Sequence, residues 1–299
     1  MRRSHLALIL IAFVALLGAA VSDRAVSFPV PLNHFYVVPN AATYKAIAGS
    51  EFLKSEFAVT ETRTTVRADS TYTGFYVYGV NTYFEFLESI SDGSIAKGAS
   101  GVAFGVDEPG GLKAIAAALP EEFPGEAQLI TRALNDRAVP WFFMAAPKSL
   151  PYGDPSGFSF WLMEYHPNFL AEWKPQPGSS NKGIARCDIL GRYAVTLGGQ
   201  PAKPLFEDVT GLTVALEEGR IKRWSELCQA FGFRLGRDKE ATVLEGPGFT
   251  LRLLPARSDW RGVREILLRL RRRPVNPGEH KMGTSVLTLR SDASAAWSF

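Results

Sequence analysis

The stretch YTGFYVYGVNTYFEFLE, residues 72–88, decides the fold. It contains two runs rich in aromatic residues, 72–78 and 82–88, separated by Gly79-Val80-Asn81. Aromatic and β-branched residues favour strands, and a short Gly/Asn-containing segment between two such runs is typical of a turn. This stretch therefore predicts a β-hairpin. Just before it, residues 60–67 are rich in Thr and Val and predict one more strand.

The residues upstream of these strands complete a unit. Residues 32–38, LNHFYVV, predict a strand that stops at Pro39-Asn40. Residues 43–57 place Tyr44, Ile47, Phe52 and Leu53 at helical spacing, with charged residues on the other side. The predicted order is thus β-α-β-β-β.

The same order of elements comes again further along the chain. Residues 101–107 predict a strand, and the Ala-rich residues 110–119 predict a helix. Three more strands are predicted at residues 129–135, 139–145 and 158–166. The N-terminal half therefore reads as two consecutive βαβββ modules.

A polar segment with prolines at residues 174–182 separates this half from the rest. Beyond it we expect a strand at 208–217, an amphipathic helix at 220–233, and strands at 241–245 and 249–254. Residues 262–271 and 284–290 are strand-like, with no helix pattern between them. We expect a leader at 1–20, an N-terminal domain at 30–173, a connecting segment at 174–207 and a C-terminal domain at 208–299, its second half degenerate.

The first twenty residues have the layout of a secretory signal peptide. Arg2 and Arg3 precede an apolar run from Leu6 to Leu17, and the small residues Gly18-Ala19-Ala20 follow. About a dozen apolar residues fall short of the roughly 20 that a spanning helix needs. We therefore expect a secreted or periplasmic protein with no transmembrane segment in the mature chain. An uncleaved N-terminal anchor is the alternative.

Charge and cysteine content limit the partners. The formal net charge is +3, and removal of Arg2 and Arg3 leaves +1. A nearly neutral chain has no broad field for nucleic acid, so we expect no nucleic-acid partner. The two cysteines, Cys187 and Cys228, could form a disulfide in an oxidising compartment or remain buried free thiols. The sequence does not set the oligomeric state.

This pattern resembles the vicinal oxygen chelate superfamily, which contains glyoxalase I, extradiol dioxygenases and bleomycin-resistance proteins. The segments most similar to sequences of this superfamily are DVTGLTV at residues 208–214 and WSELCQAFGF at residues 224–233. The N-terminal half, with residues 32–36 and 72–79, looks like an uncharacterised family of exported bacterial proteins. The resemblance implies an α+β fold of two domains, in which repeated βαβββ modules form curved mixed sheets.

The resemblance also implies a metal site, with a His on the first strand and a Glu on the last strand of a module. His34 and Glu85 hold these positions in module one, and Glu164 matches Glu85 in module two. The position in module two that faces His34 is near Val102, which cannot bind a metal. His166, two residues after Glu164, projects from the same strand face if the strand continues and could replace the missing ligand.

The resulting set of His34, Glu85, Glu164 and His166 suits a divalent metal, either Zn, Fe(II), Mn or Ni. Glu85 or Glu164 would then serve as general base when it leaves the metal. The alternatives stay open. His34 could be a hydrogen-bonded core histidine, the two glutamates could pair with strand arginines such as Arg63 or Arg132, and His166 could simply end a strand.

Aromatic residues are dense on the predicted sheets. Those that face inward could form the walls of a pocket for a flat or apolar ligand, and Tyr36, Tyr76, Tyr78 and Trp141 are the candidate substrate-binding residues.

Three functions remain: a metal-dependent enzyme acting on a small substrate with vicinal oxygens, a metal-free small-molecule-binding protein of the same fold, and a structural exported module. The residues do not decide between them.

Overall fold

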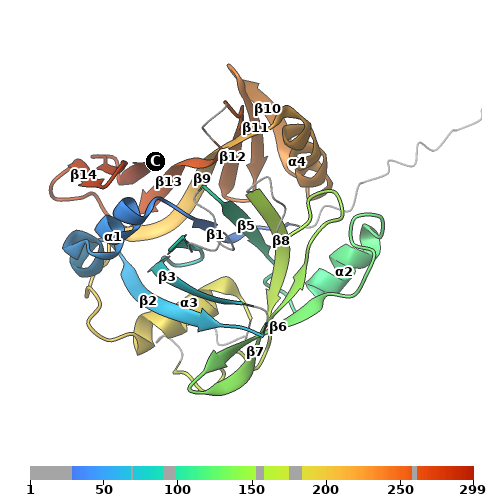
Figure 1. Ribbon diagram of the computed structural model, residues 1–299, viewed down its shortest axis with the longest axis horizontal. Coiled ribbons are helices and arrows are strands. Elements are labelled where there is room, and N and C mark those ends of the chain that lie inside the picture. Colours follow the sequence, from blue (N-terminus) through green and yellow to red (C-terminus); the bar gives the residue numbers. More distant parts are fainter. Residues whose placement is uncertain (1–28, 69, 90–97, 153–157, 175–183, 258–260) are drawn as a thin grey trace, which may run out of the picture.

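The computed structural model describes residues 29–68, 70–89, 98–152, 158–174, 184–257 and 261–299 (Figure 1). The expected leader at 1–20 and most of the expected polar segment at 174–182 lie outside the described residues. Two eight-stranded sheets make up the described part of the chain, and each has the strand order of two βαβββ modules placed back to back. The predicted α+β class with curved mixed sheets is confirmed.

The first sheet has the order β2-β3-β4-β1-β5-β8-β7-β6. The first strand of each module lies parallel to the last one, and β1 and β5 meet antiparallel at the centre. Its elements are β1 (Leu32–Val37), α1 (Ala41–Ala48), the π-helical turn η1 (Leu53–Phe57), β2 (Val59–Val66), β3 (Thr71–Tyr78), β4 (Tyr83–Leu87), β5 (Ser100–Gly105), α2 (Gly111–Ala118), β6 (Gln128–Leu134), β7 (Arg137–Ala145) and β8 (Phe158–Tyr165).

The second sheet repeats this arrangement in the order β10-β11-β12-β9-β13-β16-β15-β14. Its elements are β9 (Phe206–Leu216), α4 (Glu218–Ala230), β10 (Arg234–Asp238), β11 (Ala241–Gly246), β12 (Phe249–Pro255), β13 (Gly262–Leu270), β14 (Gly278–Met282), β15 (Ser285–Leu289) and β16 (Ser294–Ser298). Strand β10 was not predicted, because all five of its residues are exposed and show no apolar alternation.

No helix lies between β13 and β14, so the fourth module has only strands. Helix α1 of the first module packs beside β14 instead. The Thr43 hydroxyl accepts a hydrogen bond from the Thr284 N–H at 3.0 Å, and the rings of Phe52 and His280 stack at 3.7 Å. The helix that packs against the fourth module is therefore supplied by the first module.

The two faces of the first sheet have different surroundings. Alternation along β4 places Phe84 and Phe86 in the large core shared with the second sheet, where both rings contact Trp297. Glu85 projects from the opposite, concave face. A second apolar cluster covers that face and includes Tyr76, Trp141 and Trp161.

The concave face is closed at one end by a helix that the sequence analysis did not predict. Helix α3 (Arg186–Thr196) lies within the expected connecting segment and adds Ile189, Leu190 and Tyr193 to the concave cluster. The sheet curls until its edge strands β2 and β6 approach each other, and α3 runs beside them (Figure 1). The curled sheet and α3 together form a cup.

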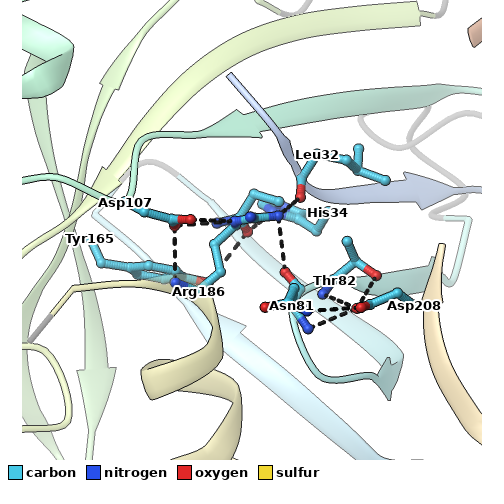
Figure 2. Close-up of polar contacts among 9 residues, drawn as sticks. Leu32, His34, Asn81, Thr82, Asp107, Tyr165, Arg186 and Asp208 are labelled. Atoms are coloured by element: carbon cyan, nitrogen blue, oxygen red, sulfur yellow. Dashed lines mark hydrogen bonds and ion pairs between the residues drawn. The ribbon is translucent and has the colours of Figure 1, made fainter. Parts of the chain in front are cut away.

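Arg186 fixes the start of α3 to the sheet (Figure 2). Its Nε pairs with Asp107 at 3.1 Å, and its Nη1 donates to the carbonyl oxygen of Leu32 on β1. The next residue, Cys187, is exposed, whereas Cys228 is buried in α4, and both are free thiols. None of the described helices is long and apolar enough to cross a bilayer.

Asp208 on β9 joins the second sheet to the β3–β4 turn of the first (Figure 2). Its buried carboxylate accepts hydrogen bonds from the backbone and side chain of Asn81, at 2.8 Å each, and of Thr82, at 3.0 and 3.1 Å. Arg269 Nη2 pairs with the same carboxylate at 3.1 Å. One carboxylate thus satisfies donors from a turn more than 100 residues away in sequence.

We expect Asp208→Asn to lower the free energy of unfolding by about 3 kcal/mol, because the amide removes the charge and turns an N–H group toward existing donors. Urea unfolding monitored by circular dichroism measures this. Glu240→Gln, which disrupts an exposed ion pair with Arg257, should stay within about 0.5 kcal/mol of wild type. Equal losses in the two variants would contradict the assigned role of Asp208.

Candidate functional site

His34 lies on β1 at the centre of the concave face. Its Nδ1 is 3.0 Å from the Asn33 Oδ1, so the proton is assigned to Nδ1 and the lone pair to Nε2. The imidazole stacks on Tyr83, with ring centroids 4.4 Å apart, and meets the edge of Trp161. Burial lowers the pKa of His34 from 6.5 to about 3. The side chain is therefore a neutral hydrogen-bond acceptor at physiological pH.

Glu85 on β4 points to the same place. Its Oε1 lies 3.7 Å from His34 Nε2, which is beyond hydrogen-bond length. Burial raises the pKa of Glu85 from 4.5 to about 7. The charge of Arg63 and hydrogen bonds from the Tyr76 and Tyr83 hydroxyls lower that pKa but do not offset the burial. Near neutral pH this carboxyl group exchanges readily between its acid and base forms.

A cavity of about 280 Å³ opens beside these two side chains. Two of the predicted ligand-binding residues, Tyr36 and Trp141, line it. Trp161 also lines it, and the indole Nε1–H of Trp161 is buried without a hydrogen-bond partner in the described part of the chain. The remaining lining residues are Arg67, Ser70, Tyr72, Leu87, Ala99, Phe142, Met144 and Tyr152.

The other two predicted ligand-binding residues do not line this cavity. The Tyr76 hydroxyl is within 3.1 Å of the Thr65 hydroxyl, and the guanidinium of Arg63 lies 3.9 Å from the Tyr76 ring centroid. The Tyr78 hydroxyl donates to Glu61 at 2.7 Å. Both tyrosines therefore belong to a polar network that also contains Arg63 and Glu61. Tyr76 connects this network to Glu85 through a side-chain hydrogen bond.

Glu164 faces the other side of the sheet, so its predicted match with Glu85 is wrong. The register pairs His34 with Ala103 and Ala103 with Trp161, which places Trp161, and not Glu164, on the concave face. Glu164 instead accepts hydrogen bonds from the N–H groups of Gly110 and Leu112 at 2.8 and 3.0 Å. It stabilises the start of α2 as an anionic cap.

His166 also lies away from His34 and Glu85. It follows the last residue of β8, its backbone N–H donates to the Trp141 carbonyl, and its Nδ1 accepts from the Asn168 N–H at 3.1 Å. Its ring packs near Phe143, whose side chain borders the large core. Val102 points into that core too, so the neighbour of His34 in module two is Ala103.

The residues present do not fit the predicted metal centre. Of the four expected ligands only His34 and Glu85 come together. Nowhere in the described ranges do three His, Cys, Asp or Glu side chains gather as a metal site. The other walls of the cavity are mostly aromatic, and two protein donors are fewer than resident catalytic metals have.

Comparison with known proteins places the chain in a family. Residues 32–299 match a family of unknown function, DUF5829. The chain belongs to this family. No curated protein matches the sequence.

Solved structures with a similar fold include a hypothetical protein from Staphylococcus aureus, with a TM-score of 0.54 and 11% identity over 85% of this chain and 96% of that one. An extradiol ring-cleaving dioxygenase from B. fuscum has a TM-score of 0.39 and 12% identity over 92% and 74% of the two chains. Homoprotocatechuate 2,3-dioxygenase from Arthrobacter globiformis has a TM-score of 0.41 and 11% identity over 89% and 77%. At this identity the first similarity concerns the fold alone, and the two dioxygenases carry no conclusion about the site.

Glu85 makes the stability of this DUF5829 protein depend on pH. Its pKa is higher in the folded chain, so its contribution to stability is fully present below pH 4.5 and is lost as the pH rises through about 7. Glu85→Gln cannot ionise. The stability of this variant relative to wild type should therefore rise by about 3 kcal/mol between pH 4 and pH 8. Urea unfolding of both proteins across this range measures the difference, and a difference independent of pH would contradict the raised pKa.

Proposed function

We propose that this chain is an exported, metal-free protein that binds a small molecule in the cavity beside His34 and Glu85. The observation that carries the proposal is the cavity itself, which combines aromatic walls with two convergent polar side chains. A purely structural module would not need such a cavity. Of the three functions open from the sequence, small-molecule binding agrees best with this geometry.

The walls define the ligand that fits. Rings of Tyr36, Trp141 and Trp161 favour a flat molecule, since aromatic faces pack against flat ligands with little loss of conformational entropy. His34 Nε2 can accept a hydrogen bond, and the Trp161 indole N–H can donate one. A ligand with a donor and an acceptor on a flat skeleton would satisfy both groups.

Proton transfer on the bound ligand is a second candidate function. It is favoured by the pKa of Glu85 at about 7, because a general acid or base works best when its pKa is near the working pH. His34 cannot take this role, since its pKa is about 3. In this reading Glu85 would take or give the proton, and His34 would orient the ligand.

Met144→Trp should abolish ligand binding, because the indole would fill much of the cavity from the half-buried end of β7. A library of small aromatic molecules screened by ligand-observed NMR detects binding to the wild-type protein. Leu129→Trp, at an exposed position of β6, is the matched control and should bind as wild type does.

The same screen repeated with EDTA separates metal-free binding from binding through a metal. We expect the same ligands to bind in EDTA and the purified protein to contain negligible Zn, Fe, Mn and Ni. Loss of binding in EDTA, restored by one of these metals, would instead support the metal-dependent enzyme. No binding by any library member would count against both.

Export rests on the layout of residues 1–20, with its arginines, apolar run and small residues. We expect the mature protein to begin at Val21, after cleavage following Ala20. Mass spectrometry of the N-terminal peptide, from protein recovered outside the cytoplasm, tests this. An intact Met1 peptide on membrane-bound protein would support an uncleaved anchor instead.

A further inference from the structure

Arg132 on β6 carries a buried charge without a counter-ion. Its side chain is only 3% exposed, and its guanidinium lies 4.9 Å from the ring centroids of both Trp141 and Phe169. Nη2 donates to the Tyr193 hydroxyl at 2.7 Å, but Nε and Nη1 have no hydrogen-bond partner within the described ranges. No ion pair of the described residues involves Arg132. An unpaired buried charge is strongly destabilising, so this arrangement calls for an anion.

The Tyr193 hydroxyl adds another unsatisfied donor. Its oxygen accepts from Arg132 and, at 3.5 Å, from Arg63. No described acceptor takes its own proton. The neighbouring tyrosines are already committed, since Tyr78 donates to Glu61 and Tyr165 to Asn33. The polar groups around Tyr193 therefore include more hydrogen-bond donors than acceptors.

A small space lies among these groups. Its volume is about 10 Å³, close to that needed for one water-sized sphere. Its walls are Arg63, the two rings that hold Arg132, and the tyrosine rings that include Tyr193. A water molecule would bring two more donors to a place that lacks acceptors. An anion of similar size would accept from Tyr193, whose hydroxyl oxygen lies 2.7 Å from Nη2 of the unpaired Arg132.

We propose that this space binds one small monovalent anion of about the size of chloride. The anion accepts the Tyr193 O–H and neutralises the charge of Arg132, since the charge of Arg63 is already paired with Glu61 at 2.7 Å. Arg63 comes from β2, Arg132 from β6 and Tyr193 from α3. The anion would therefore hold the two edges of the first sheet to the helix that closes the cup (Figure 1). This site is separate from the ligand cavity and does not depend on the proposed function.

The test compares melting temperatures of the full mature protein in sodium chloride, sodium bromide and sodium gluconate at equal ionic strength. Gluconate is too large for the space, so it controls for screening. Binding to the folded state alone should raise the melting temperature saturably, by about 3–6 °C in either halide. Equal melting temperatures in chloride and gluconate would overturn the proposal and leave a water molecule in the space.

Two variants and one control assign the effect to the site. Arg132→Met removes the charge and Tyr193→Phe removes only the hydroxyl, so both should lose the halide shift. Arg137→Met, on the same hairpin but exposed, should keep it. If a variant fails to fold, bromide-soaked crystals of the wild-type protein decide the question. An anomalous peak beside Tyr193 supports the site, and no peak there overturns it.

Discussion

Strand alternation is the constraint on which the rest of this molecule depends. The four central strands of the first sheet, β1, β4, β5 and β8, give every second side chain to the core shared with the second sheet and the others to the concave face. On β4 this separates Phe84 and Phe86, which pack against Trp297, from Glu85. On β8 it separates Glu164, which caps α2, from Trp161, which lines the cavity. The chemistry of each face follows from this division.

Burial then gives His34 and Glu85 complementary roles. The same low-polarity surroundings lower the pKa of His34 and raise that of Glu85, because both changes favour the uncharged form. A neutral imidazole and a carboxyl group that exchanges between its acid and base forms near pH 7 therefore lie side by side at the cavity. Near Tyr193, by contrast, the buried side chains of Arg63 and Arg132 keep their charge, because a guanidinium does not lose its proton in a protein.

Much of the fold was predictable from local pattern, while the site depended on register. The hairpin at residues 72–88 and both βαβββ modules were predicted because alternation and turn residues are local signals. The pairing of His34 with Ala103 is not local, and a shift of one residue changes which face a side chain joins. That is why His34 and Glu85, within one module, were brought together as expected, while Glu164 in the other was not. Helix α3 was missed because Gly191 and the β-branched Val195 and Thr196 give the segment a low helix propensity.

The strand-only fourth module has a consequence for how the chain folds. Its outer surface at β14 is sheltered by α1, through Thr43 and Phe52, from the opposite end of the polypeptide. A C-terminal fragment beginning at β9 would lack this shelter and the aromatic partners of Trp297. The two sheets are therefore expected to unfold in a single cooperative transition, and the C-terminal half to depend on the first half for its folding.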